Sequence, residues 1–409
     1  MTAVVEPRVP SALMPVEKAL DTLLAMAAAA PVEETERVGL DAAQSRVLAT
    51  RLEAGVDLPP WPNSAMDGYA LNLASYQQGT ALEVSQKIFA GQSPLPLTPG
   101  TCARIFTGAP VPPGADTVEM QENTDVLADG RVLFREAMRE GQNIRPQGQE
   151  TRRGETILDA GTYLGPIQLG LAATLGVAEL EVKRKPRVAV LSTGDELVEP
   201  GLPLGPGQIY NSNRRLLRSW LERMGCDVVD GGILPDDIDI TRQALARLSN
   251  VDLILTSGGV SVGEADYLGQ ALREAGELTF WKLAIKPGKP LTFGQYQGVP
   301  VLGLPGNPAS TLVTFALLAR PYLLKRLGCT QVTPLRFSVP AGFAWPQAGT
   351  RREYLRARLE QGKAVIYPNQ SSGVLRSAAW ADGLVEVPEN STLREGDPVS
   401  FIPLSELLA

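Results

Sequence analysis

The chain from Arg187 to Ser310 alternates short apolar runs with amphipathic stretches, and this alternation constrains the fold more than any other feature. Residues 188–191 have the apolar continuity of a strand buried in a parallel sheet. Residues 214–224 place their apolar side chains on one helical stripe. Further strands are predicted at 227–229, 253–255 and 301–303, and further helices at 240–248, 268–274 and after Pro308. Such alternation predicts a doubly wound α/β sheet with helices on both faces.

Three loops rich in glycine or proline follow predicted strands of this region. They are Ser257-Gly258-Gly259-Val260-Ser261, Pro287-Gly288-Lys289-Pro290 and Pro305-Gly306-Asn307-Pro308. Open α/β sheets bind ligands beyond the carboxyl ends of their strands, and glycine lets the backbone approach a ligand closely. Amides in the first turn of a following helix attract anions. With Lys282, Lys286 and Lys289 nearby, the loops predict a site for a multiply charged, phosphorylated small molecule.

The spacing of the lysines suggests the shape of that molecule. If residues 279–286 form one strand, Phe280, Lys282, Ala284 and Lys286 share a face. At ~3.3 Å per residue the two lysines lie about 13 Å apart along the strand. This distance favours an elongated ligand with two anionic centres, whereas the alternative is that one lysine extends into solvent.

Several carboxylates come just after predicted strand ends of the same sheet: Asp195, Glu196, Asp236, Asp237, Glu264 and Asp266. Carboxylates beside lysines would repel an anionic ligand unless a cation lies between them, and Mg²⁺ bound by oxygen meets that need. Each acid taken singly can instead cap a helix. Ser310 and Thr311 open the last helix of the region, where they can cap it or bind an anion.

The composition narrows the chemistry. The 409 residues contain no histidine, which excludes Ser-His-Asp and Cys-His nucleophile systems and histidine-ligated zinc. Acid–base work then falls to Asp, Glu, Lys, Tyr or water, and any metal is expected to be held by oxygen, which favours Mg²⁺. The net charge of −7 disfavours a broad nucleic-acid-binding surface.

The same composition bears on location. No run of ~20 apolar residues predicts a membrane span, and the N-terminus lacks the pattern of a secretory signal. The three cysteines, Cys102, Cys226 and Cys329, are scattered and belong to no pairing motif. They are expected to be reduced thiols of a cytoplasmic protein.

The rest of the chain predicts further domains around the α/β region. A helix is predicted at 15–29, short β-rich runs from about Thr50 to Phe134, another helix at 166–175, and a linker at Lys183-Arg184-Lys185-Pro186. Short strands return at 336–339, 353–358, 364–367 and 399–402, which is typical of a small closed or half-closed β domain. The predicted division is a linking domain in two segments (1–48 and 145–184), an inserted β-rich domain (49–144), the α/β domain (185–328) and a C-terminal β domain (329–409).

Motifs along nearly the whole chain, from about residue 12 onwards, closely resemble one family. They are Asn63-Ser64-Ala65-Met66-Asp67-Gly68-Tyr69-Ala70, Phe106-Thr107-Gly108-Ala109, Pro113-Gly114-Ala115-Asp116, Asn143-Ile144-Arg145, Ser192-Thr193-Gly194-Asp195-Glu196-Leu197, Gly207-Gln208-Ile209-Tyr210, residues 256–263, residues 286–290 and residues 303–308. The sequence resembles the molybdopterin molybdenumtransferases, a family that includes the E domain of gephyrin.

The resemblance implies an enzyme of molybdenum cofactor synthesis. It would take adenylylated molybdopterin and molybdate, leave molybdenum on the dithiolene and release AMP, with Mg²⁺ as the metal. The resemblance also implies a homodimer of elongated four-domain subunits, whose cleft lies between the α/β molybdopterin-binding domain of one subunit and the β-rich domain of the other. Other proteins of molybdenum cofactor synthesis are possible partners, while nucleic acid and membrane are not expected.

Motif by motif, the resemblance places catalytic roles on Asp67, Thr107, Glu196, Asp236, Asp266, Lys282 and Lys286. Of these, Asp236, Asp266 and Glu196 are expected to hold Mg²⁺, Lys282 and Lys286 to bind phosphate and oxyanion, and Asp67 and Thr107 to come from the partner subunit. Molybdate is expected near Lys282, Arg356 and Ser372. The predicted substrate-binding set is Ser257, Gly258, Gly259, Pro305, Gly306, Asn307, Pro308, Ser310, Arg356 and Ser372.

The chain departs from the family pattern at three positions. Pro62 and Asn211 replace frequent acids, and Glu150 replaces a frequent aspartate. Two other functions remain open at this point: a scaffold that binds a peptide, as the gephyrin E domain does, and an adenylyltransferase that activates molybdopterin with ATP. The first would make the acids and lysines unnecessary, and the second usually consists of a single α/β domain.

Overall fold

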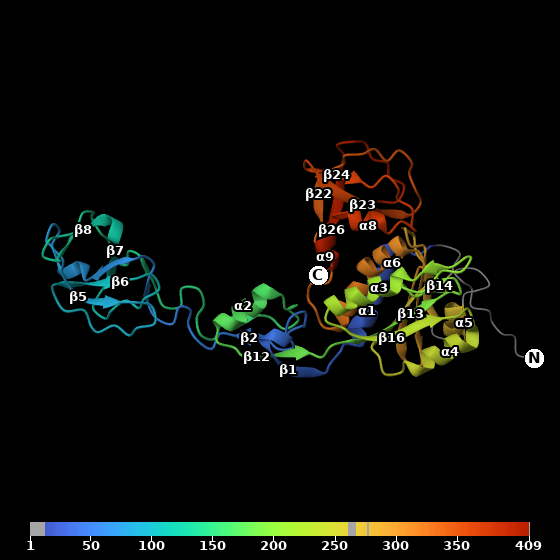
Figure 1. The fold of residues 1–409 in the computed structure, drawn as a ribbon, viewed down its shortest axis with the longest axis horizontal. Helices are drawn as coiled ribbons and strands as arrows, with labels where there is room; N and C mark the ends of the chain where they lie inside the picture. Colours follow the sequence, from blue (N-terminus) through green and yellow to red (C-terminus); the bar gives the residue numbers. More distant parts are fainter. Residues whose placement is uncertain (1–12, 261–266, 276–277, 409) are drawn as a thin grey trace, which may run out of the picture. The chain divides into compact units, whose positions relative to one another are not determined.

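The computed structural model describes residues 13–260, 267–275 and 278–408 (Figure 1). The chain divides into two compact units. The first unit contains Met1–Thr50, Ala160–Leu169 and Glu179–Ala409, and the second contains Arg51–Asp159 and Gly170–Ala178. The predicted inserted domain, 49–144, falls almost entirely within the second unit, which continues past it to Asp159.

An open six-stranded sheet forms the centre of the first unit, with the strand order β16-β13-β17-β21-β20-β18. The first four strands are parallel, and β20 and β18 are antiparallel additions at one edge. The bounds are β13 Arg187–Thr193, β16 Asp227–Leu234, β17 Leu253–Ser257, β18 Leu278–Lys282, β20 Pro290–Tyr296 and β21 Val299–Leu304. A separate short pair joins β14 (Leu197–Val198) to β15 (Ile209–Tyr210).

Helices cover both faces of this sheet, as the sequence predicts. Along β13, Val188 and Val190 pack into one core with α3 and α6, whereas Ala189 and Leu191 pack into another with α4 and α5. This alternation follows from the period-two geometry of a strand. The helices are α1 Val16–Ala29, α3 Ser212–Arg223, α4 Ile238–Arg247, α5 Tyr267–Glu274, α6 Pro308–Thr314 and α7 Arg320–Arg326, with a π-helical turn, η4, at Phe315–Ala319. The predicted doubly wound α/β architecture is confirmed.

The predicted strand at 279–286 is wrong in its length. The structure ends β18 at Lys282 and opens a separate strand, β19, at Ile285–Lys286. β18 pairs with β20 in the α/β sheet, while β19 pairs with β23 in the C-terminal sheet. Between them Leu283 and Ala284 are buried and the amide of Ala284 donates to Met14 O (2.8 Å), so the chain leaves one sheet to join another.

The C-terminal part of the first unit is a small barrel-like sheet. Its strands follow the order β19-β23-β25-β26-β22, and β24 pairs with β23. The bounds are β22 Phe337–Pro340, β23 Arg352–Glu360, β24 Lys363–Ile366, β25 Gly383–Val387 and β26 Pro398–Pro403, with α8 at Arg376–Trp380 and α9 at Leu404–Leu408. A bridge between Ala341 and Ala364 joins the two ends of the sheet around a core that includes Leu355, Val385 and Phe401. The expected half-closed β-barrel is therefore present.

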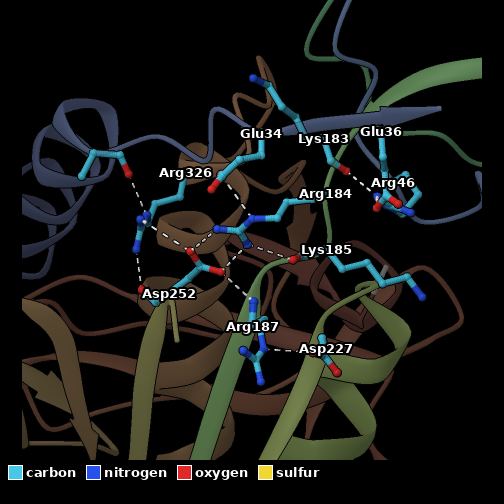
Figure 2. Close-up of polar contacts among 11 residues, drawn as sticks. Glu34, Glu36, Arg46, Lys183, Arg184, Lys185, Arg187, Asp227, Asp252 and Arg326 are labelled. Carbon is cyan, nitrogen blue, oxygen red and sulfur yellow. Dashed lines mark hydrogen bonds and ion pairs between the residues drawn. The ribbon is translucent and has the colours of Figure 1, made fainter. Parts of the chain in front are cut away.

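The predicted linker is anchored rather than loose. β1 (Thr35–Gly39) pairs with β12 (Glu179–Lys183), and the chain then crosses to β13. Figure 2 shows Arg184 donating to both carboxylate oxygens of Asp252 (2.7 and 2.9 Å), which also accepts from the amide of Arg187 (2.7 Å). Burial opposes ionisation of Asp252, but these hydrogen bonds and the charges of Arg184 and Arg326 outweigh it and lower the pKa of the carboxyl.

The second unit is β-rich. Its four-stranded sheet has the order β5-β6-β4-β7, with cores on both faces that include Tyr69 and Phe134 on one side and Ile88 and Ile105 on the other. The bounds are β2 Leu52–Glu53, β3 Asn63–Ser64, β4 Gly68–Leu71, β5 Glu83–Ile88, β6 Thr101–Ile105, β7 Thr117–Met120, β8 Thr124–Val126, β9 Val132–Phe134, β10 Ile144–Arg145 and β11 Thr156–Leu158. The 3₁₀ turns at Leu73–Ser75 and Gln121–Asn123 also belong to this unit, whereas the turn at Leu40–Ala42 belongs to the first unit and α2 (Pro166–Thr174) includes residues of both.

Candidate functional site

A cavity of about 380 Å³ lies at the carboxyl ends of β13, β17 and β21. This is the edge at which ligands of open α/β sheets bind. Two of the three predicted loops meet there, and the third contributes its last residue, Pro290. The lining residues are Thr193, Glu196, Leu197, Ile209, Asn213, Ser257, Gly258, Gly259, Val260, Pro290, Pro305, Gly306, Asn307, Pro308 and Ser310. The cavity thus brings together all eight predicted substrate-binding residues of the α/β domain.

Glycine is required in the loop after β17. Gly258 and Gly259 adopt φ values of +91° and +65°, which L side chains rarely adopt. A Cβ atom on Gly259 would lie 2.6 Å from Thr193 Oγ1, and one on Gly258 would lie 2.6 Å from the Thr193 carbonyl oxygen. The paired glycines let the β17 loop lie directly against the end of β13 and leave the cavity open.

Two polar residues that sequence reasoning did not single out also line the cavity. Thr193 and Asn213 are 8% and 7% exposed. Asn213 donates from Nδ2 to Gly306 O (2.6 Å), but within the described residues neither Asn213 Oδ1 nor Thr193 Oγ1 has a hydrogen-bond partner. Buried polar oxygens are normally paired, so these two atoms are available to a bound molecule. Asn213 lies three residues after β15 and is the second residue of α3.

Carboxylates gather at the ends of β13 and β16. Asp195 Oδ1 accepts from the amide of Asp236 (3.1 Å), and Glu196 lines the cavity. Burial, followed by the negative charges of Asp195 and Glu196, raises the pKa of Asp236. Repulsion of this kind is relieved by a bound cation, and oxygen donors are what Mg²⁺ prefers.

The metal assignment nevertheless remains a prediction. Across residues 13–260, 267–275 and 278–408 no three or more Asp, Glu, Cys or His side chains converge closely enough to hold a metal ion. Asp266, the third predicted ligand, and Glu264 lie outside the described residues. Asp237 acts as a helix cap, because its Oδ1 accepts from the amide of Ile240 (2.8 Å) at the start of α4.

The lysines lie on the connection between β18 and β20, and none of them lines the cavity. Lys282 is the last residue of β18 and pairs with Pro290. Lys286 Nζ lies 3.0 Å from Glu353 Oε2 and 5.9 Å from the ring centroid of Trp345, both in the C-terminal part of the unit. Since Pro290 does line the cavity, the lysine-bearing loop is at its border.

Arg356 and Ser372 are placed beside the same border from the C-terminal sheet. Arg356 is 1% exposed and donates to Ser377 Oγ (3.0 Å), Tyr354 O (3.3 Å) and Ser371 O (3.2 Å). Burial lowers its pKa to about 10. Ser372 O accepts from the amide of Ala309 (2.9 Å), next to Pro308 and Ser310 in the cavity wall.

Asp67 and Thr107 lie together in the second unit. Asp67 Oδ1 accepts from both the amide (2.8 Å) and the hydroxyl (2.9 Å) of Thr107. The backbone hydrogen bond, then the side-chain one, lowers the pKa of Asp67. The sequence predicted a shared role for these residues from motifs 40 positions apart, and the structure joins them directly.

Comparisons with known proteins decide the family. Residues 14–176 match the MoeA N-terminal region (domain I and II), residues 189–325 a probable molybdopterin binding domain, and residues 338–404 the MoeA C-terminal region (domain IV). The molybdopterin molybdenumtransferase of Haemophilus influenzae is 40% identical over 384 residues, covering 92% of this chain and 95% of that protein. The chain belongs to the molybdopterin molybdenumtransferase family.

Other relatives agree. The molybdopterin molybdenumtransferase of Synechococcus elongatus is 37% identical, covering 93% of this chain and 97% of that protein. A solved MoeA structure from Pyrococcus horikoshii OT3 shares 30% identity and a TM-score of 0.81, covering 96% of this chain and all of that one. Membership of this family of transferases identifies the chain as an enzyme. The described part of the chain holds no helix with the length and apolar character that crossing a membrane requires.

The three departures from the family pattern have different local settings. Asn211 is 2% exposed and caps α3, its Oδ1 accepting from the amide of Arg214 (3.2 Å). The carbonyl of Pro62 accepts from the amide of Val111 (3.0 Å). The side chain of Glu150 is exposed, and its amide donates to Leu58 O (2.8 Å). Asn211 therefore has a structural role as the cap of α3, but aspartate fills that role equally well, so the cap does not explain the replacement.

Proposed function

We propose that this protein transfers molybdenum from molybdate to adenylylated molybdopterin and releases AMP. The names of its relatives support the reaction class. The observation that carries the proposal is the cavity at the sheet edge, because it assembles the predicted loops around two buried, unpartnered oxygen atoms. Its volume of about 380 Å³ lies in the range of small-molecule sites.

The cavity is suited to the pterin ring. Among the described residues that line it, Glu196 is the one ionisable residue, and the others are glycine, proline, aliphatic, or neutral hydrogen-bonding residues. An uncharged heterocycle with donor and acceptor groups along its edge fits such a lining better than a phosphate does. Thr193 and Asn213 supply acceptors that water or a ligand has to satisfy.

The phosphates then extend toward the loop between β18 and β20. Lys282 and Lys286 would neutralise the negative charge that develops as the phosphoanhydride breaks. Lys286 would exchange part of its contact with Glu353 for the substrate, since both lie at the cavity border. Molybdate, a dianion, would bind beside Arg356, whose guanidinium is fully buried and donates to a hydroxyl and to carbonyls.

The mutual repulsion of the carboxylates at the ends of β13 and β16 supports a proposed Mg²⁺ site there. We propose that Asp236 and Glu196, with Asp266 as predicted from the resemblance, hold the ion. When bound, Mg²⁺ supplies positive charge to the phosphate oxygens. Asp236 has to be ionised for this role, and its raised pKa makes its ionisation sensitive to mild acid.

A homodimer would complete the site. In the proposal Asp67 and Thr107 of a second copy close the cleft, and the lowered pKa of Asp67 keeps it charged there. Other proteins of molybdenum cofactor synthesis are proposed to deliver the substrate or accept the product.

One experiment tests the reaction. Purified protein is mixed with adenylylated molybdopterin and Mg²⁺, with or without molybdate, and AMP is measured together with molybdenum that remains bound to the pterin. The proposal expects AMP release that requires molybdate and matches the molybdenum inserted. ATP consumption with unadenylated molybdopterin would indicate an adenylyltransferase instead, and inactivity in both assays would contradict either enzyme.

A further inference from the structure

Two stacked aromatic rings lie on the second unit next to the Asp67–Thr107 pair. The centroids of Phe89 and Phe106 are 4.6 Å apart and their planes differ by 5°. Each ring directly follows a strand, because β5 ends at Ile88 and β6 ends at Ile105. Phe89 is 43% exposed, so an aromatic surface beside a predicted site faces solvent. Exposed aromatic surface that is not buried in a core is a common feature of ring-binding sites.

Two cations flank these rings. Lys87 and Arg104 are directly opposite each other on β5 and β6. Lys87 Nζ lies 5.1 Å from the Phe89 centroid, and Arg104 Cζ lies 4.4 Å from the Phe106 centroid. Like charges placed directly opposite on neighbouring strands destabilise a sheet. The Lys87–Arg104 pair therefore destabilises the sheet, although the protein as a whole has a net charge of −7. A bound anion would offset this repulsion.

The acid whose pKa Arg104 influences, Asp67, is already hydrogen-bonded to Thr107. Arg104 donates to neutral acceptors, namely Gly68 O (2.8 Å), Ile105 O (3.1 Å) and the side-chain oxygen of Gln121. The hydrogen bonds from the amide and hydroxyl of Thr107, and to a smaller extent the charge of Arg104, lower the pKa of Asp67. Among the described residues neither Lys87 nor Arg104 forms an ion pair with a carboxylate, as their contacts are with rings, carbonyls and an amide.

The rings are held in place by the main chain. The amide of Phe89 donates to Gln92 Oε1 (3.0 Å), and the amide of Gln92 donates back to Phe89 O (3.2 Å). The amide of Phe106 donates to Ile88 O (3.2 Å), and Phe106 O accepts from the amide of Ala109 (2.9 Å). Such preorganisation lowers the entropy lost when a ligand stacks on the surface.

We infer that Lys87, Phe89, Arg104 and Phe106, here named the aromatic platform, bind a planar heteroaromatic ring that carries a phosphate. The identity of the ligand rests on the proposed function. If the substrate is adenylylated molybdopterin, the ring and phosphate that bind here are those of its adenylate half. The purine stacks on the open face of Phe89, and Lys87 and Arg104 attract the phosphate.

Photolabelling of the full-length protein locates the ring. The probe is 8-azidoadenosine 5′-monophosphate, irradiated on the protein without molybdate and then mapped after trypsin digestion. Cleavage after Lys87 and Arg104 yields a peptide of residues 88–104 that carries Phe89, followed by a peptide of residues 105–131 that carries Phe106. Label on either peptide that excess AMP suppresses is expected. Label confined to residues 185–328 would overturn the platform.

Binding measurements separate ring from phosphate. Phe89→Leu is expected to weaken AMP binding about tenfold, from the stacking of one base, and to leave ribose 5-phosphate binding unchanged. Lys87→Gln should weaken both ligands, and more at low salt. Phe337→Leu is the matched control, because Phe337 is exposed (51%) on β22 of the first unit. AMP affinity that is unaffected by Phe89→Leu refutes the proposal.

Further measurements show whether the platform binds a free nucleotide or the adenylate of the substrate. They also distinguish failure of the platform proposal from failure of the proposed function. AMP and ATP are titrated separately, and a preference for ATP would indicate a free nucleotide rather than the adenylate of the substrate. Binding is measured without turnover, so a protein that binds AMP on the platform but inserts no molybdenum contradicts only the proposed function. A protein that inserts molybdenum but binds AMP normally after Phe89→Leu contradicts only the platform.

Discussion

Lys286 Nζ lies 3.0 Å from Glu353 Oε2, so an ion pair joins two directly paired residues, one on β19 and one on β23 of the C-terminal sheet. Glu353 is 5% exposed, whereas the lysine side chain is half-exposed. In the proposed site, a substrate phosphate would reach Lys286 from solvent while Glu353 holds the lysine in position. Because β19 follows β18 along the chain, this pair fixes the lysine where the chain passes from the α/β sheet into the C-terminal sheet.

Removing this lysine should weaken substrate binding in a salt-dependent way. Lys286→Ala is expected to raise KM for adenylylated molybdopterin about tenfold at low salt and by a smaller factor at high salt, because ions screen an exposed charge. Steady-state AMP release at several salt concentrations measures this. Lys363→Ala, which removes an exposed lysine paired with Glu395, is the control. Equal KM values for Lys286→Ala and the unaltered protein at every salt concentration would exclude a role in phosphate binding.

Magnesium binding should depend on pH through Asp236. Burial and the charges of Asp195 and Glu196 raise its pKa, so the carboxyl takes up a proton at a higher pH than an ordinary aspartate. Mg²⁺ affinity, measured by calorimetry, should fall as the pH drops through this raised pKa. Asp195→Asn removes one of the repelling charges and should shift the midpoint to lower pH. A midpoint that does not move would show that Asp195 does not act on Asp236.

Arg356 should govern molybdate use. Arg356→Gln removes a buried charge and is expected to raise KM for molybdate by about 10- to 100-fold, as the loss of a charged hydrogen bond does, with AMP binding unchanged. Ser377→Ala removes the partner of Arg356 Nε but keeps the charge, so its effect should be smaller. The measurement is molybdate dependence of AMP release. A normal KM for molybdate in a folded Arg356→Gln protein would place the molybdate elsewhere.

Gly259→Ala should close the cavity. Its Cβ would lie 2.6 Å from Thr193 Oγ1 at a φ of +65°, so both strain and a clash arise. Gly298→Ala has similar backbone strain (φ +81°) but nothing within 4 Å of its Cβ. Both variants should lose about 1–2 kcal/mol of stability from the backbone. Only Gly259→Ala should also lose substrate binding, and comparable binding by both variants would contradict the cavity assignment.

Asp252 should stabilise the fold above acidic pH. Its pKa is lowered in the folded state, so its contribution is present above the unfolded pKa of about 4 and is lost as the pH falls through the folded value. Asp252→Asn should cost about 2–3 kcal/mol at neutral pH, from its charged hydrogen bonds to Arg184 and Arg187.

The exposed pair of Asp129 and Arg131 provides the matched control for that loss, and Asp129→Asn should change little. Thermal and urea unfolding at pH 7 and pH 4 measure both variants. If Asp252→Asn and the unaltered protein unfold at the same midpoint at pH 7, the cluster in Figure 2 contributes no net stability.

Much of the α/β domain could be predicted because its strands are continuously apolar. Strands 188–191 and 253–255 lie within β13 and β17, and helix 268–274 lies within α5. Local patterns of this kind are dictated by burial on both faces of a parallel sheet. The loops after β17 and β21 could be placed at one edge of the sheet because neighbouring parallel strands end on the same side.

The remaining features depend on contacts that are distant in the sequence. The strand predicted at 279–286 divides because Ile285 pairs with Arg352, 67 positions away, and no local pattern reveals that partner. Thr193 and Asn213 were missed because burial without a hydrogen-bond partner is visible only in three dimensions. Pairing of Asp67 with Thr107 was expected only through the family resemblance.

The connection from β18 to β20 has a further consequence. Its main chain is bonded to three neighbours: Leu283 N to Lys289 O, Ala284 N to Met14 O, and Ala284 O to the amide of Arg352. Surface hairpins ordinarily accept an added residue, because their ends are the only fixed points. Here one inserted residue between Ala284 and Lys289 would shift either Lys286 or Pro290 out of register, so natural variants of this enzyme should keep the length of this segment constant.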